Sequence, residues 1–449
     1  MDAPTLEQAL PIPEQWAFPD VAGEQIELAA YWHRLDDPLI DEYVARARTG
    51  NLDIAQALAR LRAAKAGLRD ARSARLPSAS AGGGIGREIG DFARDEAQFS
   101  VNADVSWDAD LFGRISGSID ASRANFRAAG YTAADAERVI IATVATQVVT
   151  ARSIAAQLEI SRASLANQDD NLMIAQWRNQ AGLVSSLDVE QARTQRAQTA
   201  ASIPLLESDL VATANAISTL IGEAPGDVYN ALLSDQRGVP SAISSVALSA
   251  PADTLRMRPD VRAAELQLAA DMERIGVARA QLYPLVRLTG SIGSTSFGVG
   301  DLFDVITGNV LAGVTQLLFD GGRTRAQIET AEAVADGSLA AWRQSILVAL
   351  EDVETASFDL KASNERVISL GEASEGARNA ALLGRSQYQA GLIDFQVLLS
   401  AESQLLNART AEVSAKAARA AAYIRLARSM GGGWRLPAEN MILEGNSGQ

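Results

Sequence analysis

The stretch that decides the fold is Phe99-Ser100-Val101-Asn102-Ala103-Asp104-Val105-Ser106-Trp107-Asp108-Ala109-Asp110-Leu111. Its odd-numbered residues are all apolar and its even-numbered residues are all polar. Strict alternation predicts a β-strand, because successive side chains of a strand point to opposite faces. We therefore expect an apolar face that carries Val101, Val105 and Trp107. The opposite, polar face is expected to carry Asp104, Asp108 and Asp110.

This strand belongs to a unit that occurs twice in the chain. Residues 71–77 match residues 278–284 at an offset of 207, and residues 114–222 match residues 323–431 at an offset of 209 without a gap. Loops accumulate insertions, so a gapless register of this length indicates continuous regular structure. The chain is therefore an internal duplication.

Each half also contains a very long helix. No Pro, the residue that interrupts helices, occurs between Pro77 and Pro204 or between Pro284 and Pro437. In the first of these stretches apolar residues recur at every seventh position: Val144, Ala151, Leu158, Leu165 and Leu172. That repeat indicates a coiled-coil seam. A helix over residues 114–179 would be roughly 100 Å long at about 1.5 Å per residue.

The expected organisation follows from these patterns. It is an N-terminal extended segment at 1–50, a first repeat at 51–222, a linker at 223–257, a second repeat at 258–431 and a C-terminal tail at 432–449. After an initial helix, the first repeat has strands at about 78–90 and 99–113, a long helix at 114–179, a hairpin tip at 180–185 and a return helix at 186–221. The second repeat likewise has strands at about 285–298 and 305–320, a long helix at 323–388, a tip at 389–394 and a return helix at 395–430.

Four strands cannot close a barrel within one chain. Membrane barrels need about eight or more strands, and an open sheet exposes two edges. Two copies of the chain would supply eight strands, whose interior is filled by side chains, whereas three copies would supply twelve and leave a lumen. Aromatic residues near the strand ends suit the two membrane interfaces. They are Phe92, Phe99, Phe297 and Phe303 at one end and Phe112, Tyr283 and Phe319 at the other.

The composition excludes several classes of function. The 449 residues include 40 Lys and Arg against 55 Asp and Glu, a net charge of −15, and no basic stripe, so no nucleic acid is expected as a partner. The single imidazole, His33, and the absence of Cys exclude zinc, iron–sulfur and disulfide sites. Gly82–Gly84 and Gly431–Gly433 lack the Lys and the Ser or Thr of a phosphate loop. We expect no metal, no cofactor and no enzymatic activity.

No apolar run reaches the ~18 residues of a membrane-spanning helix, so a helical membrane protein is not expected. The first residues, Met1-Asp2-Ala3-Pro4, also lack the features of a signal peptide, which leaves a cytoplasmic protein or a processed chain.

The order of helix, strand pair, long helix and return helix, given twice, resembles the TolC-like outer-membrane factors. These are the exit ducts of tripartite efflux pumps in Gram-negative bacteria. The resemblance extends from about Tyr31 to Trp434. Its sharper motifs are Trp107–Arg114, Leu318–Arg323, the two Gln-Ala-Gly-Leu tips and Met430-Gly431-Gly432-Gly433-Trp434. The last motif resembles the ending of members that work with resistance-nodulation-division pumps.

The resemblance implies a mainly α fold with a small antiparallel β part. Long coiled-coil helices would form an α-barrel tunnel through the periplasm, and four strands per protomer would join a trimeric twelve-stranded β-barrel in the lipid of the outer membrane. The homotrimer would pass drugs outward from a periplasmic adaptor protein and an inner-membrane resistance-nodulation-division transporter. Many such relatives carry a lipid-modified N-terminal Cys, which this chain lacks. Either the anchor was removed or the protein never had one.

The resemblance also directs attention to particular residues. Each tip would dock the adaptor through a turn glycine and exposed apolar side chains: Gly182, Leu183 and Val184 in the first tip, and Gly391, Leu392 and Ile393 in the second. Tyr388 matches a Tyr that in relatives helps to hold the periplasmic end of the tunnel shut. Relatives often place an Asp after two Leu on the return helix, but Ser400 stands there, which leaves Asp394 and Asp188 as further gate candidates.

On the strand, the resemblance implies that Asp104, Asp108 and Asp110 line the barrel lumen and that Val101, Val105 and Trp107 face lipid. We also expect Gly182 and Gly391 to have positive φ, because a helix that reverses direction needs a left-handed residue.

Two alternative functions remain open at this point. A periplasmic helical adaptor or scaffold also uses coiled-coil hairpins, but such proteins carry one hairpin within small β domains, not two equivalent hairpins. An outer-membrane duct for type I protein secretion shares the fold, and the Gly-Gly-Gly-Trp ending disfavours it. The transported substrate is not indicated by the sequence, because a water-filled duct need not recognise its cargo.

Overall fold

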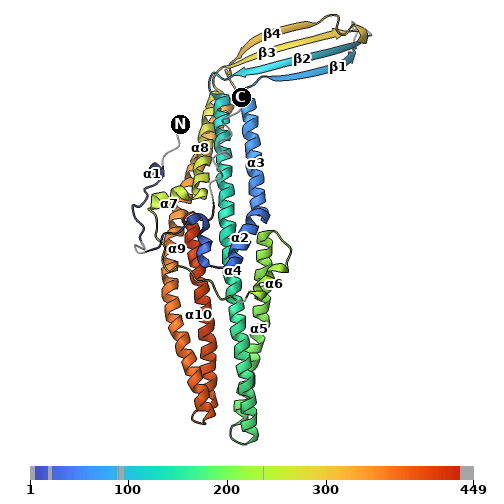
Figure 1. Ribbon diagram of the computed structural model, residues 1–449. Coiled ribbons are helices and arrows are strands. Elements are labelled where there is room, and N and C mark those ends of the chain that lie inside the picture. Colours follow the sequence, from blue (N-terminus) through green and yellow to red (C-terminus); the bar gives the residue numbers. More distant parts are fainter. Residues whose placement is uncertain (1–5, 19–22, 88, 90–95, 236, 435–449) are drawn as a thin grey trace. The chain divides into compact units, whose positions relative to one another are not determined.

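The computed structural model describes residues 6–18, 23–87, 89, 96–235 and 237–434 (Figure 1). Its elements, in chain order, are α1 (Leu6–Ala9), the 3₁₀ helix η1 (Leu28–Leu35), α2 (Pro38–Gly50), α3 (Leu52–Ser73), β1 (Ser78–Arg87), β2 (Ala97–Ala109), α4 (Arg114–Gln180), α5 (Ser186–Ile221), α6 (Asp227–Ser234), α7 (Pro251–Met257), α8 (Pro259–Ala280), β3 (Leu285–Ser296), the 3₁₀ helix η2 (Val299–Asp301), β4 (Thr307–Thr315), α9 (Arg323–Gln389) and α10 (Phe395–Ser429). The fold is mainly helical with one small antiparallel sheet, as the sequence predicts.

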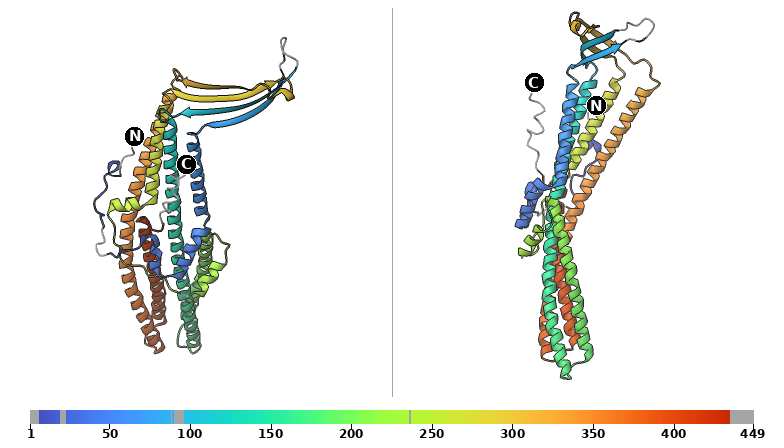
Figure 2. Two further views of the ribbon diagram at one scale, coloured as in Figure 1. Left: turned by 45° about the horizontal axis from the view of Figure 1, so that its top comes forward. Right: turned by 90° about the vertical axis from the view of Figure 1, so that its right-hand side faces the viewer.

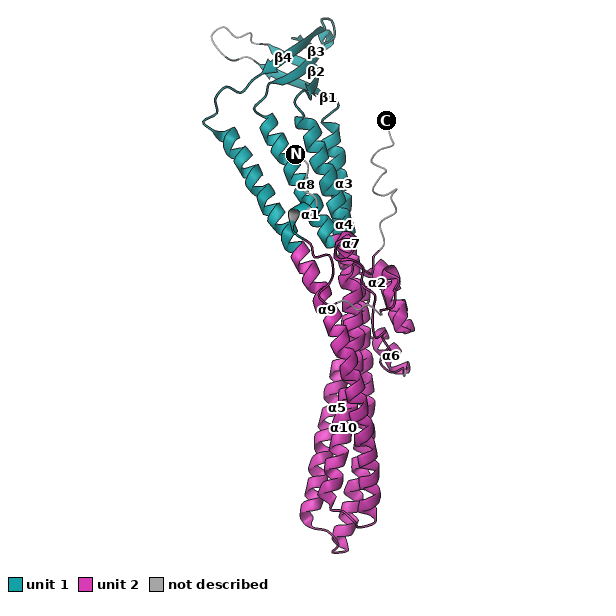
Figure 3. Ribbon diagram, turned by 90° about the vertical axis from the view of Figure 1, so that its left-hand side faces the viewer, with its two compact units in different colours: residues 1–11, 58–132, 260–345 teal, residues 12–57, 133–259, 346–449 magenta. Residues whose placement is uncertain are grey.

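The chain forms two compact units, and these are not the two sequence repeats (Figure 3). Unit 1 comprises residues 1–11, 58–132 and 260–345, and unit 2 comprises residues 12–57, 133–259 and 346–449. Each unit therefore combines matching parts of both repeats. The long helices α4 and α9, of 67 residues each, contribute to both units.

Unit 1 contains the sheet, in the order β1-β2-β3-β4, and every neighbouring pair is antiparallel. β2 of the first repeat pairs with β3 of the second, with Trp107 opposite Leu288. Figures 1 and 2 show the strands as one curved layer without a helix of unit 1 on either face. Both faces and the two edge strands, β1 and β4, are therefore uncovered within this unit.

The helices of unit 1 join the sheet at one end of each strand. α3 precedes β1, β2 precedes α4, α8 precedes β3 and β4 precedes α9. A small apolar cluster of Leu68, Ile115, Ile119 and Phe126 packs α3 against the first turns of α4. The sheet and its helices are thus connected through four short junctions.

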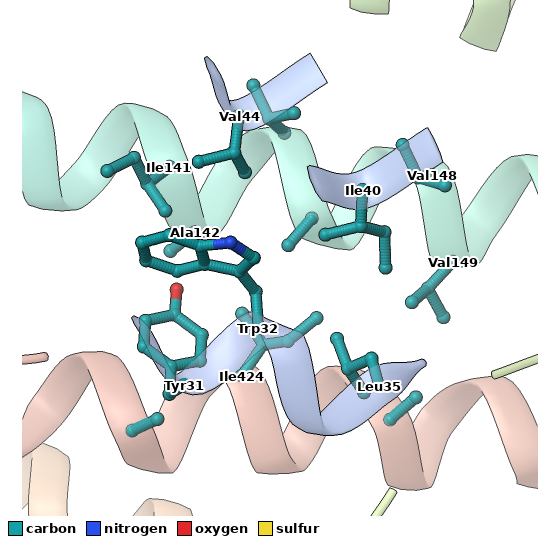
Figure 4. Packing of buried hydrophobic residues seen from close by; sticks show 14 of the residues in the cluster. Tyr31, Trp32, Leu35, Ile40, Val44, Ile141, Ala142, Val148, Val149 and Ile424 are labelled. Atoms are coloured by element: carbon teal, nitrogen blue, oxygen red, sulfur yellow. The ribbon is translucent and has the colours of Figure 1, made fainter. Parts of the chain in front are cut away.

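Unit 2 holds the main hydrophobic core, and the N-terminal segment is central to it. Tyr31, Trp32 and Ile40 are at most 3 % exposed. Figure 4 shows Tyr31 and Trp32 between α4 and α10. The expectation of an extended segment at 1–50 is therefore wrong. Asp37 caps α2 by accepting a hydrogen bond from the backbone N–H of Leu39, and the Pro that follows Asp37 suits the first helical position.

A buried ion pair ties this segment to α4. The guanidinium of Arg152 donates to both carboxylate oxygens of Asp37, at 2.9 and 3.1 Å, and to Asp235 at 2.6 Å. Arg152 is only 1 % exposed. Hydrogen bonding from Arg152 holds the pKa of Asp235 below its usual value. Asp235 follows α6, so the region expected to be a plain linker, 223–257, contains the helices α6 and α7 and a core contact.

The glycines of the Met430–Trp434 motif allow close backbone contact. A Cβ on Gly432 would lie 2.8 Å from the carbonyl oxygen of Leu28, and the N–H of Gly433 donates to that same oxygen at 2.8 Å. Gly431 has a φ of +86°. The motif therefore closes the end of α10 onto the N-terminal segment. The expected C-terminal tail lies mostly outside the described residues, which end at 434.

The heptad positions of α4 behave as a core seam. Val144, Ala151 and Leu158 are at most 4 % exposed, and Leu165 and Leu172 are half-buried. By length and composition α4 is also apolar enough to cross a membrane, but 56 % of its most apolar window is buried inside the structure. Its hydropathy is therefore that of a helix that packs against other helices.

Candidate functional site

One face of the sheet is apolar across all four strands. The register places Val105 between Ala79 and Gly290, and Trp107 opposite Leu288. Further apolar residues of this face are Ala81, Ile85, Phe99, Val101, Ala103, Ala109, Val286, Ile292, Val310, Ala312 and Val314. Val105 is 45 % exposed and Val310 is 88 % exposed. A single chain leaves this apolar surface open, which is the feature expected of a lipid-facing or partner-facing surface.

The opposite face of the sheet is mostly polar, although β4 contributes the exposed Leu311 opposite Thr289. Ser78, Ser80, Asn102, Ser106, Thr289, Ser291 and Asn309 share it with Asp104 and Asp108. The carboxylate of Asp104 accepts a hydrogen bond from the amide of Asn102. Asp108 pairs across the strands with Arg287, at 2.7 Å, and with Arg114 at the start of α4, at 3.1 Å. The negative charge of Asp108 is therefore compensated by two guanidinium groups, whereas the carboxylate of Asp104 accepts only from a neutral amide in the described structure.

Asp110 does not belong to the polar face of the strand. β2 ends at Ala109, and the Asp110 carboxylate accepts hydrogen bonds from the backbone N–H groups of Ile115, at 2.9 Å, and Ser116, at 2.8 Å. The first N–H groups of a helix lack partners within it, so Asp110 stabilises the start of α4. The expectation that Asp110 lines a lumen is therefore a misinterpretation of an N-terminal cap.

In the second repeat, Asp320 caps the start of α9 in the same way. Asp320 accepts a hydrogen bond from the backbone N–H of Thr324, at 2.8 Å, and another from its hydroxyl, at 2.7 Å. These bonds lower the pKa of Asp320. Gly113 and Gly322, at the two junctions, have φ of +76° and +92°, values that favour glycine. The two motifs Asp-Leu-Phe-Gly-Arg and Asp-Gly-Gly-Arg are therefore strand-to-helix junctions.

Aromatic side chains gather at the junction end of the sheet. Phe112 and Tyr283 stack with ring centroids 4.9 Å apart, and Phe319 is 90 % exposed. At the other end, Phe297 and Phe303 are 44 % and 69 % exposed. Phe92 lies outside the described residues. Exposed aromatics at both ends of an apolar strand face are typical of membrane-spanning sheets.

The two hairpin tips have the same backbone geometry. Gly182 and Gly391 have φ of +72° and +76°, which confirms the expectation of a left-handed glycine at each tip. The N–H of Leu183 donates to the carbonyl of Arg178 at 2.8 Å, and the N–H of Leu392 donates to that of Gln387 at 2.9 Å. These bonds form the Schellman pattern that ends a helix.

The apolar residues of the tips divide into two classes. Leu183 and Leu392 are 73 % and 74 % exposed. Val184 and Ile393 are half-buried, and Ile393 packs against the cluster of Phe395 and Leu398. Of the four apolar side chains expected to be exposed, only the two leucines project into solvent.

The gate candidates lie in different environments. Tyr388 is 3 % exposed, packs on Phe395 and lies under the guanidinium of Arg178, 4.4 Å from the ring centroid. Asp188 forms a capping box with Ser185 at the start of α5, and Asp394 is the N-cap of α10 without a side-chain capping bond. Ser400 is exposed and lines a groove between α5 and α10 with Leu399. Among these four candidates, Tyr388 is the one with a described side-chain contact to the other hairpin, through Arg178.

A buried polar cluster just above the tips was not expected. Glu402 of α10 accepts hydrogen bonds from Asn171 of α4 and from Arg385 of α9, the latter at 3.0 Å. Glu402 is 9 % exposed and Asn171 is 4 % exposed. The signal in the sequence is that Glu402 stands four residues after Leu398 and three before Leu405, on the apolar face of α10. A carboxylate at such a position needs a partner.

Comparison with known proteins agrees with this geometry. A family model described as outer membrane efflux protein matches residues 44–223 and 250–432. Nodulation protein T of Rhizobium leguminosarum bv. viciae is 29 % identical over 95 % of this chain and 89 % of its own length. Outer membrane protein OprJ of Pseudomonas aeruginosa is 27 % identical, with 96 % and 92 % covered. The solved outer-membrane channel OprN aligns with a TM-score of 0.83 and 31 % identity over 95 % of this chain and 99 % of that one.

These likenesses confirm the resemblance to the outer-membrane factors, the outer-membrane location and the role as an efflux channel. A family of channels that serve efflux pumps also implies partners in a pump and argues against a role as an enzyme or as a periplasmic adaptor. Since the family model matches both repeats from end to end, the chain belongs to the outer membrane efflux protein family.

Proposed function

We propose that three copies of this chain close one twelve-stranded barrel, which is the outlet of a tripartite efflux pump. The observation that carries this proposal is the open sheet, with β1 and β4 as edges and one apolar face exposed. Within hydrocarbon an unsatisfied backbone N–H or C=O costs several kcal/mol, so open edges are not tolerated there. Other copies of the chain can supply the missing strands.

Strand direction and side-chain size support three copies. Neighbouring strands alternate in direction, so β4 of one copy can pair antiparallel with β1 of the next. Two copies would make an eight-stranded barrel, whose interior is filled by side chains. Three copies leave a lumen, and the small polar residues of the inner face, with Asp104 and Asp108, would line it.

The tips supply the surface for a partner. Leu183 and Leu392 are more exposed than a turn requires, and exposed apolar side chains favour a protein contact. We propose that both tips bind a periplasmic adaptor, which in turn binds an inner-membrane resistance-nodulation-division transporter. Gly182, Val184, Gly391 and Ile393 are proposed to shape the two turns that present the leucines. The exposed face with Val101, Val105 and Trp107 is proposed to meet lipid.

Tyr388 is the best-supported gate residue. It lies between the two hairpins, against Arg178, where a change in hairpin spacing would alter its contacts. Asp188 and Asp394 lie at helix starts and Ser400 lines a groove between α5 and α10, so we propose a smaller role in gating for these three residues. We propose small molecules as cargo, since relatives are named for toluene and pyoverdine.

Cysteine cross-linking of the sheet edges tests the barrel, because these 449 residues contain no Cys that could form a competing disulfide. Ala81→Cys on β1 is combined in turn with Val310→Cys or Ala312→Cys on β4. Within one chain these strands are three strand spacings apart, about 14 Å, which is too far for a disulfide. Oxidation in membranes is expected to give covalent dimers and trimers on denaturing gels.

The matched control pair is Ala103→Cys with Ile292→Cys, whose residues face each other on β2 and β3 of one chain. It is expected to link without a gain in mass. Efficient linking of the control pair together with failure of every edge pair would contradict the proposed barrel.

A further inference from the structure

A groove in unit 2 lies between α4 of the first hairpin (α4 and α5) and both helices of the second hairpin (α9 and α10). Its lining residues fall within 160–167 of α4, 378–385 of α9 and 402–409 of α10. On each helix they are spaced i, i+3, i+4 and i+7, so each helix presents a single face to the groove. The groove has a volume of about 200 Å³. A cavity of about 150 Å³ holds benzene, so the groove has room for an aromatic ring.

The end of the groove nearer the tips is electrically neutral. Arg385 of α9 donates to one carboxylate oxygen of Glu402 of α10 at 3.0 Å, and Asn171 of α4 donates to the other oxygen. Both charges of this pair are therefore compensated within the chain.

The far end of the groove carries two arginines at one level. Arg378 stands seven residues before Arg385 on α9, and Arg409 stands seven residues after Glu402 on α10. α9 runs toward its tip and α10 runs away from it, so both steps lead in the same direction, about 10 Å from the neutral pair. Both arginines line the groove. The antiparallel register thus brings two guanidinium groups to the same end of one groove.

Carboxylates of the chain leave these two cations largely uncompensated. Neither Arg378 nor Arg409 forms an ion pair in the part of the chain that the structure describes. The charge of Arg378 acts on Glu412, one turn beyond Arg409, but Lys416 donates to that carboxylate at 2.7 Å. Glu375, one turn before Arg378, is exposed. Two like charges at one level repel each other, so an anion between them is favoured, although the whole chain has a net charge of −15.

The wall between the two ends is apolar. Leu382 of α9, Leu405 and Leu406 of α10 and Ile160 of α4 contribute to it. Ile160 is 9 % exposed, whereas Leu382 is 69 % exposed, so the groove has a covered floor and an edge that is open to solvent. An apolar wall with a few convergent polar groups is the usual composition of a small-molecule site.

We propose that this groove binds a small aromatic carboxylate. The carboxylate lies between Arg378 and Arg409, because a guanidinium can donate two parallel hydrogen bonds to a carboxylate. The ring lies against Leu382, Leu405 and Ile160, and a second fused ring can extend toward the open edge. A ring of the same size without the negative charge would leave the two cations uncompensated.

The lining comes from both hairpins of one chain, so the bound carboxylate connects them. A ligand shifts a protein toward the conformation that it binds best, and here that is the hairpin spacing of this structure. The site needs no second copy of the chain, and therefore it does not rest on the proposed barrel.

Calorimetric titration of the full chain in a non-ionic detergent tests the charge preference. The probe is naphthoate, and its matched controls are the neutral naphthamide and the naphthylmethylammonium cation, which share its ring system. Naphthoate is expected to bind at least about tenfold more tightly than either control, because hydrogen bonds to charged groups are the stronger ones.

Variants of the full chain test the location. Arg378→Gln and Arg409→Gln are each expected to weaken the binding of naphthoate about tenfold or more. Arg366→Gln is the matched control, since Arg366 is an exposed arginine of α9 that does not line the groove. Ala163→Phe keeps both arginines but fills the groove from α4, and it is expected to abolish binding.

Thermal unfolding provides a second readout and shows that each variant is folded. Naphthoate is expected to raise the midpoint of the wild type and of Arg366→Gln, and to leave that of Arg409→Gln unchanged. Equal affinity for the three probes, or no binding of naphthoate, would overturn the proposed site. Equal effects of Arg409→Gln and Arg366→Gln, or unchanged binding by Ala163→Phe, would overturn its location. The cross-links of the sheet edges test the barrel separately, so either proposal can fail without the other.

Discussion

Replacing Val105 by Arg tests whether the apolar face of the sheet meets lipid. Val105 is flanked by Ala79 and Gly290, two small residues that cannot cover a long charged side chain. It is two positions from Ala103, the middle of β2 (Ala97–Ala109). If the face is embedded, the guanidinium enters hydrocarbon.

The depth of Val105 sets the size of the effect. With a rise of about 3.3 Å per residue and a tilt of about 45°, two residues correspond to about 5 Å along the membrane normal. The apolar band is about 25 Å tall, so Val105 lies roughly 7 Å inside its boundary. Arg costs about 2–4 kcal/mol at the midplane and about 0–1 kcal/mol at the interface, so we expect about 2 kcal/mol per chain.

The free energy of unfolding from lipid vesicles, measured by urea titration, gives the required comparison. Asn102→Arg is the matched control, since Asn102 lies on the polar face of the same strand and at similar depth. We expect the control to change the free energy by no more than about 0.5 kcal/mol. Equal costs for the two variants would refute the assignment of the faces.

Further expectations concern unit 2 and the tips. Replacing Arg152 by Met leaves the buried Asp37 carboxylate without its cation and is expected to cost about 3–5 kcal/mol in thermal or urea unfolding. Arg152 lowers the pKa of Asp235 in the folded protein, so the pair of Arg152 and Asp235 contributes its full stability at a pH above about 3.8, the pKa of Asp235 in the unfolded chain. This contribution is lost as the pH falls through the lower pKa of the folded protein. Asp235→Asn is therefore expected to make the free energy of unfolding less dependent on pH between pH 5 and pH 2. Leu183→Asp and Leu392→Asp are expected to abolish adaptor cross-linking and drug efflux while assembly and membrane insertion remain normal; unimpaired efflux in both would exclude docking at the tips.

The regular elements could be predicted because their periodicities are strong. The alternation from Phe99 to Leu111 identifies β2 and its two faces, and the gapless offset of 209 identifies two equivalent hairpins. The pairing of β2 with β3 could not be predicted in the same way, since the cross-strand pair of Asp108 and Arg287 joins the two repeats. Sequence patterns within a repeat contain no information about that register.

The expectations that differ from the structure share a physical cause. A polar side chain has several possible hydrogen-bond partners, and the sequence does not show which one it meets. Asp110 continues the alternation of β2, but the unpaired N–H groups at the start of α4 are closer partners than a lumen. Asp37 followed by Pro is a helix start, and the Asp37 side chain caps α2 in a segment that was expected to be extended. Glu402 lies on an apolar face of α10, and its hydrogen-bond donors Asn171 and Arg385 come from α4 and α9. These partners are brought together only when the two hairpins pack.

The mass of the detergent-solubilised particle, measured by light scattering with correction for bound detergent, tests the central proposal most directly. Three chains of 47.4 kDa are expected, because only three copies bring the four strands of each chain to a twelve-stranded barrel with a lumen. A particle that contains one or two chains and still conducts in a planar bilayer would contradict it.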